Sequence, residues 1–225
     1  MVSPAPPESA PTCDHGAVTL LVIETEYGPA HVHCHNVTEP KGVLVLGHGA
    51  GGGIGARDLV EAKDVANAAG LSVALVEQPY RVAGRRSAAP AWQLDVAWMA
   101  VVGELRARWF HELPIVVGGR SSGARVACRT SGATGAVGVL CLAFPLQPPQ
   151  GARPEPRPSR LPELDTVSVE TLVVSGERDA FGVPPESARR AVCVVPGDHS
   201  LRNGLATKGP LVAQWLSARV NEFRK

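Results

Sequence analysis

The stretch "VVGGRSSGARVACR", residues 116–129, joins an apolar strand pattern to the start of a helical pattern through a glycine-rich turn. Residues 119–123 within it fit the pattern G-x-S-x-G. Between a buried strand and a helix, this pattern is typical of a nucleophile elbow, a strained turn that lifts a serine hydroxyl above the sheet. The flanking positions leave no room for side chains, so glycine is needed there. The spacing predicts Ser121 as a nucleophile and the backbone N–H of Ser122 as a donor to a substrate carbonyl oxygen.

The partners of Ser121 are expected downstream, because an unassisted serine hydroxyl is a poor nucleophile near neutral pH. "SGERDAFG" places Asp179 just past one later strand pattern, and "PGDHSL" places His199 just past the next. A histidine is the usual base for a serine, and a carboxylate usually orients that histidine. Glu177 and Asp198 are the nearest rival carboxylates, but Asp198 adjoins His199 and is poorly placed to reach back to the imidazole. We therefore predict a triad of Ser121, Asp179 and His199.

A second donor to the substrate oxygen is expected in the early motif "LGHGAGGG", residues 46–53. An oxyanion is stabilised by two donors, and this motif follows a buried strand on the same edge of the predicted sheet. The N–H of Ala50 is the best candidate, with that of Gly49 as the alternative. We expect Ala50 and Ser122 to form the oxyanion hole.

The same glycines also fit a competing pattern, because Gly47, Gly49 and Gly52 spell G-x-G-x-x-G after a strand. Glu77 ends the next strand, near the position of a ribose-binding acid in dinucleotide sites. This interpretation ranks lower, since the pattern arises easily by chance in a chain with 24 glycines. It also leaves the elbow and the two downstream residues unexplained. We expect no cofactor, and a titration with NAD(P)H, followed by its fluorescence, discriminates between the two interpretations.

Apolar runs and helical patterns alternate along the chain, which indicates an α/β fold with a mostly parallel sheet and helices on both faces. The first two strands are expected to form an antiparallel edge. We expect one domain over residues 16–225, preceded by a disordered segment, 1–15, rich in proline and alanine. Strands are expected at 17–25, 30–37, 42–49, 71–79, 113–119, 135–145, 170–176 and 190–197, and helices at 56–70, 91–109, 123–132 and 209–225.

Composition excludes some classes of partner. The net charge of +1 gives no reason to expect nucleic acid or a membrane surface. No apolar run approaches the roughly 18 residues that span a bilayer. Five cysteines occur without a C-x-x-C pair, and Cys128 and Cys141 lie in apolar runs that favour a place in the core. A reducing, cytoplasmic location fits this pattern best.

Together, "GHGAGG", "GGRSSGARVA", "SGERDAFG" and "GDHSL" resemble the α/β-hydrolase superfamily. More closely, they are similar to small bacterial hydrolases related to dienelactone hydrolase, as is "QPYRVAGRR". The resemblance covers the chain from about Gly42 to its C-terminus. It implies hydrolysis of an ester, thioester or similar acyl bond of a small molecule, with no cofactor. The chain departs from dienelactone hydrolases in having Ser121 where they carry cysteine, and it has no room for a helical cap domain.

We therefore expect a serine hydrolase of carboxylesterase type that works through an acyl-enzyme. The rival hypothesis is a non-catalytic scaffold or binding protein that has kept the fold, because fold does not determine function. A fluorophosphonate probe separates the two, since it labels only an activated serine. Labelling of Ser121 is expected of the enzyme and not of the scaffold.

Three further features have open roles in the sequence. His31, His33 and His35 alternate on one face of an early strand, a spacing that can hold zinc but more often forms a solvated face. Residues 144–168 are crowded with prolines, which argues against a regular helix and favours a loop that can cover the pocket. Four arginines are candidates to hold an acidic substrate group at the pocket mouth, although solvated or ion-paired arginines are more common: Arg81, Arg85, Arg86 and Arg120.

Overall fold

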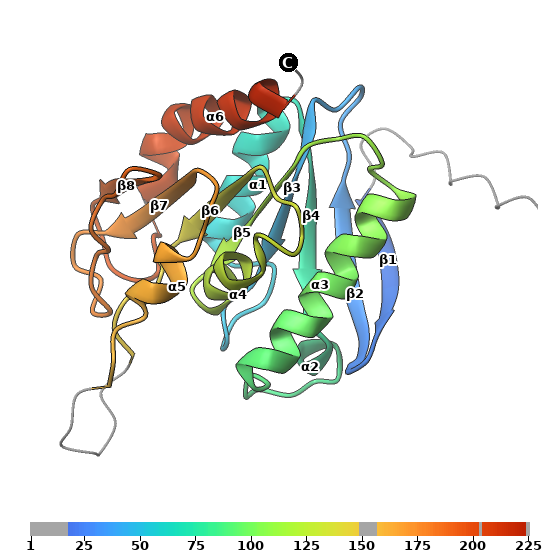
Figure 1. The fold of residues 1–225 in the computed structure, drawn as a ribbon, viewed down its shortest axis with the longest axis horizontal. Coiled ribbons are helices and arrows are strands. Elements are labelled where there is room, and N and C mark those ends of the chain that lie inside the picture. The colour runs from blue at the N-terminus through green and yellow to red at the C-terminus, as the bar shows by residue number, and fades with distance from the viewer. Residues whose placement is uncertain (1–17, 149–156, 203, 224–225) are drawn as a thin grey trace, which may run out of the picture.

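The computed structural model describes residues 18–148, 157–202 and 204–223. These residues form one eight-stranded sheet with the order β1-β2-β4-β3-β5-β6-β7-β8 (Figure 1). The strands β3 to β8 run parallel, while β2 pairs antiparallel with both β1 and β4. The mostly parallel sheet and its antiparallel edge are therefore confirmed. The strands are β1 (Val18–Thr25), β2 (Gly28–His35), β3 (Gly42–Gly47), β4 (Leu71–Glu77), β5 (Ile115–Arg120), β6 (Gly138–Leu142), β7 (Thr171–Gly176) and β8 (Arg190–Val195).

Helices cover both faces of the sheet. On one face α3, α4 and α5 lie in front of the strands in Figure 1, and α1 and α6 cover the other face. The strands β3, β5, β6 and β7 are apolar on both faces because each face packs against helices. The described residues contain no helical cap domain. The helices are α1 (Arg57–Ala68), α2 (Pro79–Val82), α3 (Ala91–Arg108), α4 (Ser122–Thr130), α5 (Leu161–Asp165) and α6 (Gly204–Phe223).

Sequence patterns mislead at the ends of elements. The helical pattern of 209–225 puts Phe223 on the same side as Leu216 and Val220, but Phe223 is exposed at the last residue of α6, where 221–223 are all exposed. The helix α6 also begins at Gly204, earlier than the helical pattern indicates. The proline-rich segment, expected to lack helix, contains the short α5, where Pro162 is tolerated because it stands in the first turn. Residues 149–156 of that segment lie outside the described residues.

Four cysteines are buried in the core: Cys34, Cys128, Cys141 and Cys193. The core placement predicted for Cys128 and Cys141 is confirmed, and their sulfur atoms lie 3.5 Å apart. Cys13 and the predicted disordered segment 1–15 lie outside the described residues. Within the described ranges, no helix combines the length and the apolar character that a membrane span requires.

Candidate active site

Ser121 stands at the junction of β5 and α4, in a strained backbone conformation with φ 53° and ψ −107°. A non-glycine residue rarely adopts a positive φ, and such strain is typical of functional turns. The neighbouring glycines explain how the turn fits. A Cβ on Gly119 would lie 2.5 Å from the Gly47 carbonyl oxygen, and one on Gly123 would also meet the backbone of Gly47 and that of His48. Both glycines of the pattern are therefore required, because the end of β3 closely approaches β5 at Gly119 and the start of α4 at Gly123.

The three predicted triad residues lie together. His199 Nε2 is 3.0 Å from Ser121 Oγ, and His199 Nδ1 is 2.8 Å from Asp179 Oδ2. The Asp179 side chain is fully buried, whereas that of His199 is partly exposed. A proton on Nδ1 donates to the carboxylate, and Nε2 is then left with a lone pair that accepts from the serine hydroxyl. The geometry is that of a hydroxyl, a base and an orienting acid in one chain of hydrogen bonds.

The loops after β7 and β8 hold the acid and the base. Asp179 Oδ1 accepts a hydrogen bond of 2.9 Å from the Phe181 N–H, and the Phe181 ring packs edge-on against the His199 ring at 4.5 Å between centroids. The rival carboxylates have other partners. Asp198 accepts from the backbone N–H and the hydroxyl of Ser200, and the exposed Glu177 pairs with the neighbouring Arg178.

Three hydrogen bonds fix the loop that carries Ala50. The Tyr80 hydroxyl donates to the Ala50 carbonyl at 3.0 Å, and His48 Nδ1 lies 2.8 Å from the Gly49 carbonyl. His48 Nε2 accepts from the Gln78 N–H at 3.2 Å, which places the proton of a neutral imidazole on Nδ1. Burial lowers the pKa of His48 below its ordinary value and keeps this ring neutral. The histidine of "GHG" and the tyrosine of "QPYR" thus hold the candidate oxyanion loop, residues 48–50, which the motifs alone did not indicate.

Arg120 contacts helix α1 and the histidine loop. Its Nε donates to Asp58 Oδ2 at 2.8 Å, and its Nη2 donates to the His199 carbonyl at 3.3 Å. Asp58 is almost fully buried at the start of α1, and burial raises the pKa of its carboxyl, an effect that the Arg120 guanidinium opposes. The hypothesis that Arg120 holds an acidic substrate group is therefore not favoured. Arg120 instead connects the serine turn, helix α1 and the histidine loop.

A cavity of about 320 Å³ opens beside Ser121. The candidate arginines Arg81, Arg85 and Arg86 are absent from its described lining, whereas three other arginines take part. The ends of the proline-rich segment contribute Pro145 and Arg160 to the wall. The lining residues are Ala50, Ala88, Ala89, Ala91, Leu94, Ser121, Ser122, Arg125, Arg129, Pro145, Arg160 and Phe181.

Comparison with known families agrees with this geometry. The family model for the alpha/beta hydrolase domain matches residues 40–214, which is most of the chain. The chain belongs to the α/β-hydrolase family. The predicted resemblance and fold class are thereby confirmed. A search of curated protein sequences found no match.

Solved structures show the same fold at low sequence identity. An alpha-beta serine hydrolase homologue from Coxiella burnetii is 16% identical, with a TM-score of 0.71 over 88% of this chain and 97% of that chain. Est1E from Butyrivibrio proteoclasticus is 14% identical, with a TM-score of 0.72 over 90% and 99%. A dienelactone hydrolase from Anabaena variabilis is 14% identical, with a TM-score of 0.70 over 91% and 99%. These neighbours show the shared fold, and the family match supports a hydrolase enzyme.

The competing dinucleotide pattern has a different geometry in this α/β-hydrolase. Helix α1 begins only at Arg57, beyond all three glycines of the pattern, so its N-terminus does not follow them directly as a phosphate site requires. Glu77 faces His33, with 3.3 Å between His33 Nε2 and Glu77 Oε2. The glycines are therefore not arranged to bind a pyrophosphate at a helix N-terminus, and Glu77 is paired with a histidine.

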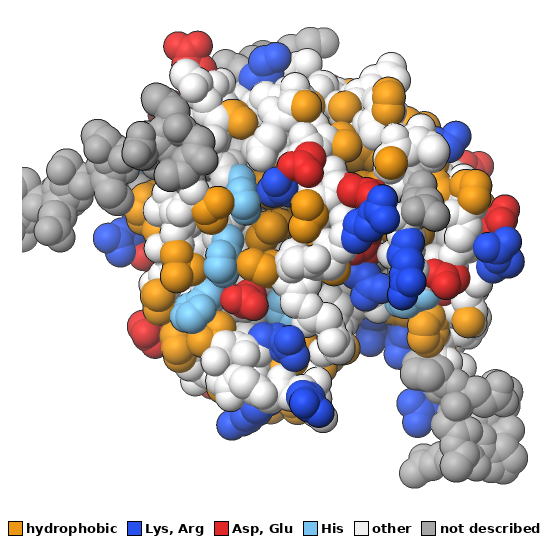
Figure 2. All heavy atoms as spheres, turned by 180° about the vertical axis from the view of Figure 1, so that it is seen from behind, with side chains coloured by type: hydrophobic (Ala, Val, Ile, Leu, Met, Phe, Trp, Pro, Cys, Tyr) orange, Lys and Arg blue, Asp and Glu red, His pale blue; other side chains and the backbone are white. Residues whose placement is uncertain are grey.

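The histidine row lies on the rear face of the sheet, where Figure 2 shows it as a pale blue column. The register pairs Val18, Leu20 and Val22 of β1 with these histidines of β2. Within the part of the chain that the structure describes, no group of three or more His, Cys, Asp or Glu side chains is placed to hold a metal ion.

Proposed function

We propose that this α/β-hydrolase is a serine hydrolase that cleaves an ester, thioester or similar acyl bond of a small molecule. The observation that carries the proposal is the chain of contacts from Ser121 Oγ to His199 Nε2 at 3.0 Å and from His199 Nδ1 to Asp179 Oδ2 at 2.8 Å. A hydroxyl in this arrangement can transfer its proton to the base as it attacks a carbonyl carbon.

The first half of the reaction forms an acyl-enzyme. Ser121 Oγ forms a bond to the carbonyl carbon of the substrate, and its proton passes to His199 Nε2. The bond from that carbon to the leaving oxygen or sulfur then breaks, and the leaving group takes the proton from Nε2. Asp179 holds the imidazole in the required tautomer and stabilises its transient positive charge.

The second half of the reaction releases the acid. A water molecule bonds to the acyl carbon while His199 Nε2 accepts its proton, and collapse of this second intermediate returns a proton to Ser121 Oγ. In both halves a negative charge develops on the former carbonyl oxygen. The N–H groups of Ala50 and Ser122 are proposed to stabilise it, since both residues line the pocket beside Ser121 and Ser122 is the first residue of α4.

Turnover of short-chain p-nitrophenyl esters tests the proposal. The Ser121→Ala variant is expected to lose at least about a thousandfold in kcat, as triad serines do. The matched control is Ser122→Ala, which keeps the backbone N–H and is expected to retain activity within about tenfold of the wild type. Activity that survives in the first variant and disappears in the second would contradict the assignment of Ser121.

A further inference from the structure

The lining of the pocket beside Ser121 contains two chemical kinds of side chain. The apolar lining consists of small side chains, Leu94 and the Phe181 ring. The arginine wall consists of three guanidinium groups, those of Arg125 and Arg129 on helix α4 and that of Arg160 just before α5. Such clustering of like charge beside a candidate nucleophile needs either protein carboxylates or a ligand to balance it.

Two of the three arginines are balanced within the protein. Arg125 makes a two-pronged contact with Glu163, with distances of 2.8 and 2.5 Å. Arg129 makes the same kind of contact with Asp95, at 2.8 and 2.6 Å, and a further one of 3.2 Å with Glu163. Two carboxylates therefore neutralise two guanidiniums, and the fork of each arginine is occupied.

Arg160 differs from the other two. Among the described residues, no carboxylate lies within 4.0 Å of its guanidinium, and its side-chain hydrogen bond is to the Pro145 carbonyl, 3.1 Å from Nη1. That bond anchors one edge of the guanidinium at the pocket wall. Burial and the neighbouring Arg125 lower the pKa of Arg160, as expected of a cation among cations. Counted over the residues that the structure describes, the arginine wall therefore carries one positive charge in excess.

We propose that Arg160 binds an ionised carboxylate of the substrate, so that the preferred substrates are small esters or thioesters with a second, free carboxylate. The inference rests on the proposed function, since the carboxylate is placed by the same pocket that holds the acyl group against Ser121. A single unbalanced guanidinium matches the single charge of a carboxylate better than the double charge of a phosphate. The apolar lining would contact the carbon chain between the ester and the carboxylate.

The test compares two p-nitrophenyl esters of equal chain length, the glutarate monoester, which is anionic, and the valerate, which is neutral. The wild type is expected to prefer the anionic ester by about ten- to a hundredfold in kcat/KM, the range of one charge-assisted hydrogen-bond pair. In Arg160→Gln the ratio is expected to fall to near one, and in Arg160→Lys to an intermediate value. Unchanged urea midpoints would establish that these variants remain folded.

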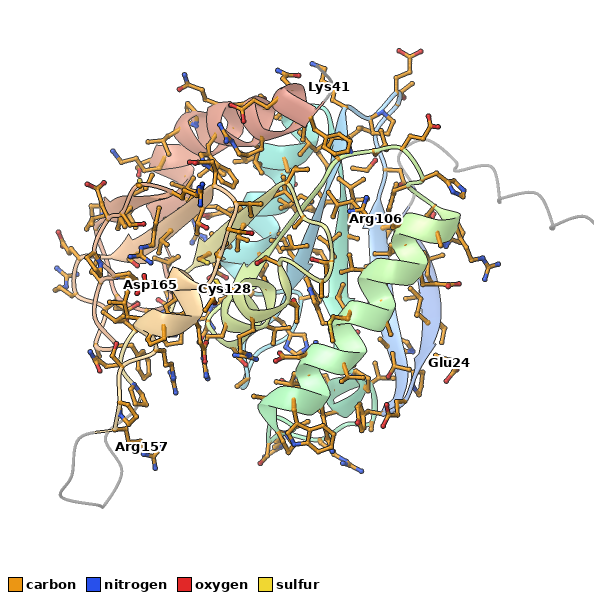
Figure 3. The ribbon with its side chains drawn as sticks, in the orientation of Figure 1. Glu24, Lys41, Arg106, Cys128, Arg157 and Asp165 are labelled. Atoms are coloured by element: carbon orange, nitrogen blue, oxygen red, sulfur yellow. The ribbon has the colours of Figure 1, made fainter. Side chains whose placement is uncertain are left out.

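Arg157→Gln is the matched control. It removes the same charge three positions earlier, on the loop that leads to α5 (Figure 3), but Arg157 is exposed and absent from the pocket lining. Its ratio is expected to stay within about threefold of the wild type, because exposed charges are screened by salt. If the preference for the anionic ester falls equally in Arg157→Gln and Arg160→Gln, the preference comes from the general positive charge of this region. That result would overturn the proposal.

Failure of the inference and failure of the proposed function have different signatures. Hydrolysis of the valerate ester through Ser121, with no preference for the glutarate, would overturn the inference and leave the function standing. If neither ester is hydrolysed, the proposed function fails. Calorimetric titration of monomethyl glutarate into Ser121→Ala and into the double variant with Arg160→Gln then decides carboxylate binding. Binding to the first alone supports the carboxylate site, and binding to neither overturns it.

Discussion

Arg120 and Asp58 form an ion pair of 2.8 Å between Nε and Oδ2, directly behind the serine turn. The same guanidinium donates to the carbonyl of His199, so one side chain connects the start of α1 to the loop of the predicted base. We therefore infer that the arginine beside the nucleophile is a positioning residue that acts through the histidine loop. Its pair with Asp58 matters because an isolated charge at this depth would be costly.

Replacement of Arg120 by lysine is expected to lower kcat about tenfold with little change in KM, because one ammonium cannot reach both Asp58 and the His199 carbonyl in the geometry of the fork. Asp58→Asn leaves the guanidinium without its counter-charge and is expected to lower the free energy of unfolding by about 3 kcal/mol. Steady-state kinetics and urea denaturation measure the two effects. A lysine variant with normal kcat would contradict a positioning role.

The loop that carries Ala50 gives a second kinetic prediction. Tyr80→Phe removes the hydroxyl that donates to the Ala50 carbonyl and is expected to reduce kcat by about three- to tenfold, since the loop loses one hydrogen bond. Tyr27→Phe is the matched control, because that hydroxyl donates to the side chain of its neighbour Glu26 at the surface and not to the loop. If the two variants have the same kcat, the Tyr80 hydroxyl does not hold the loop.

Stability should depend on pH through His48. Its pKa is lowered by burial from the ordinary value of 6.5, so the unfolded chain binds more protons than the folded protein between the lowered pKa and 6.5. The contribution of His48 to stability is therefore fully present above pH 6.5 and is lost as the pH falls through this window. Urea denaturation at pH 5.5 and 7.5 measures it, and His48→Asn should reduce the difference between the two values. The pKa of His35 is also lowered by burial, so a smaller dependence is expected to remain in that variant.

Alanine substitutions at two helical glycines are expected to change stability in opposite directions, one through close packing and the other through helix propensity. Gly123→Ala places a methyl group against the backbone of Gly47 and is expected to destabilise the protein by at least about 2 kcal/mol. Gly103→Ala in α3 meets nothing within 4 Å and is expected to stabilise it by about 0.5–1 kcal/mol, because alanine is the better helix former. Unfolding in urea measures both, and a neutral Gly123→Ala would show that the turn can relax.

Features encoded in short segments could be predicted from the sequence. The meeting of Ser121, Asp179 and His199 could also be predicted, because each residue follows a strand of the same parallel sheet. Contacts between distant side chains that no such pattern marks could not. The strands and the elbow follow from apolar runs and the glycine spacing around Ser121, since a β-strand or a tight turn depends on neighbouring residues. The arginine wall depends on residues of α4 and on the start of α5, which meet only in the folded chain. Arg125 and Arg129 are one helical turn apart, a spacing that equally fits a solvated face. The cytoplasmic location stays a prediction.

Labelling with a fluorophosphonate tests the central claim most directly, because the probe reacts covalently with a serine only where a base has activated it. Intact-mass measurement followed by peptide mapping should find one adduct per chain, on Ser121, and the adduct should form much more slowly in His199→Ala. No adduct, or an adduct on Ser122 with Ser121 unmodified, would contradict a mechanism based on Ser121, His199 and Asp179.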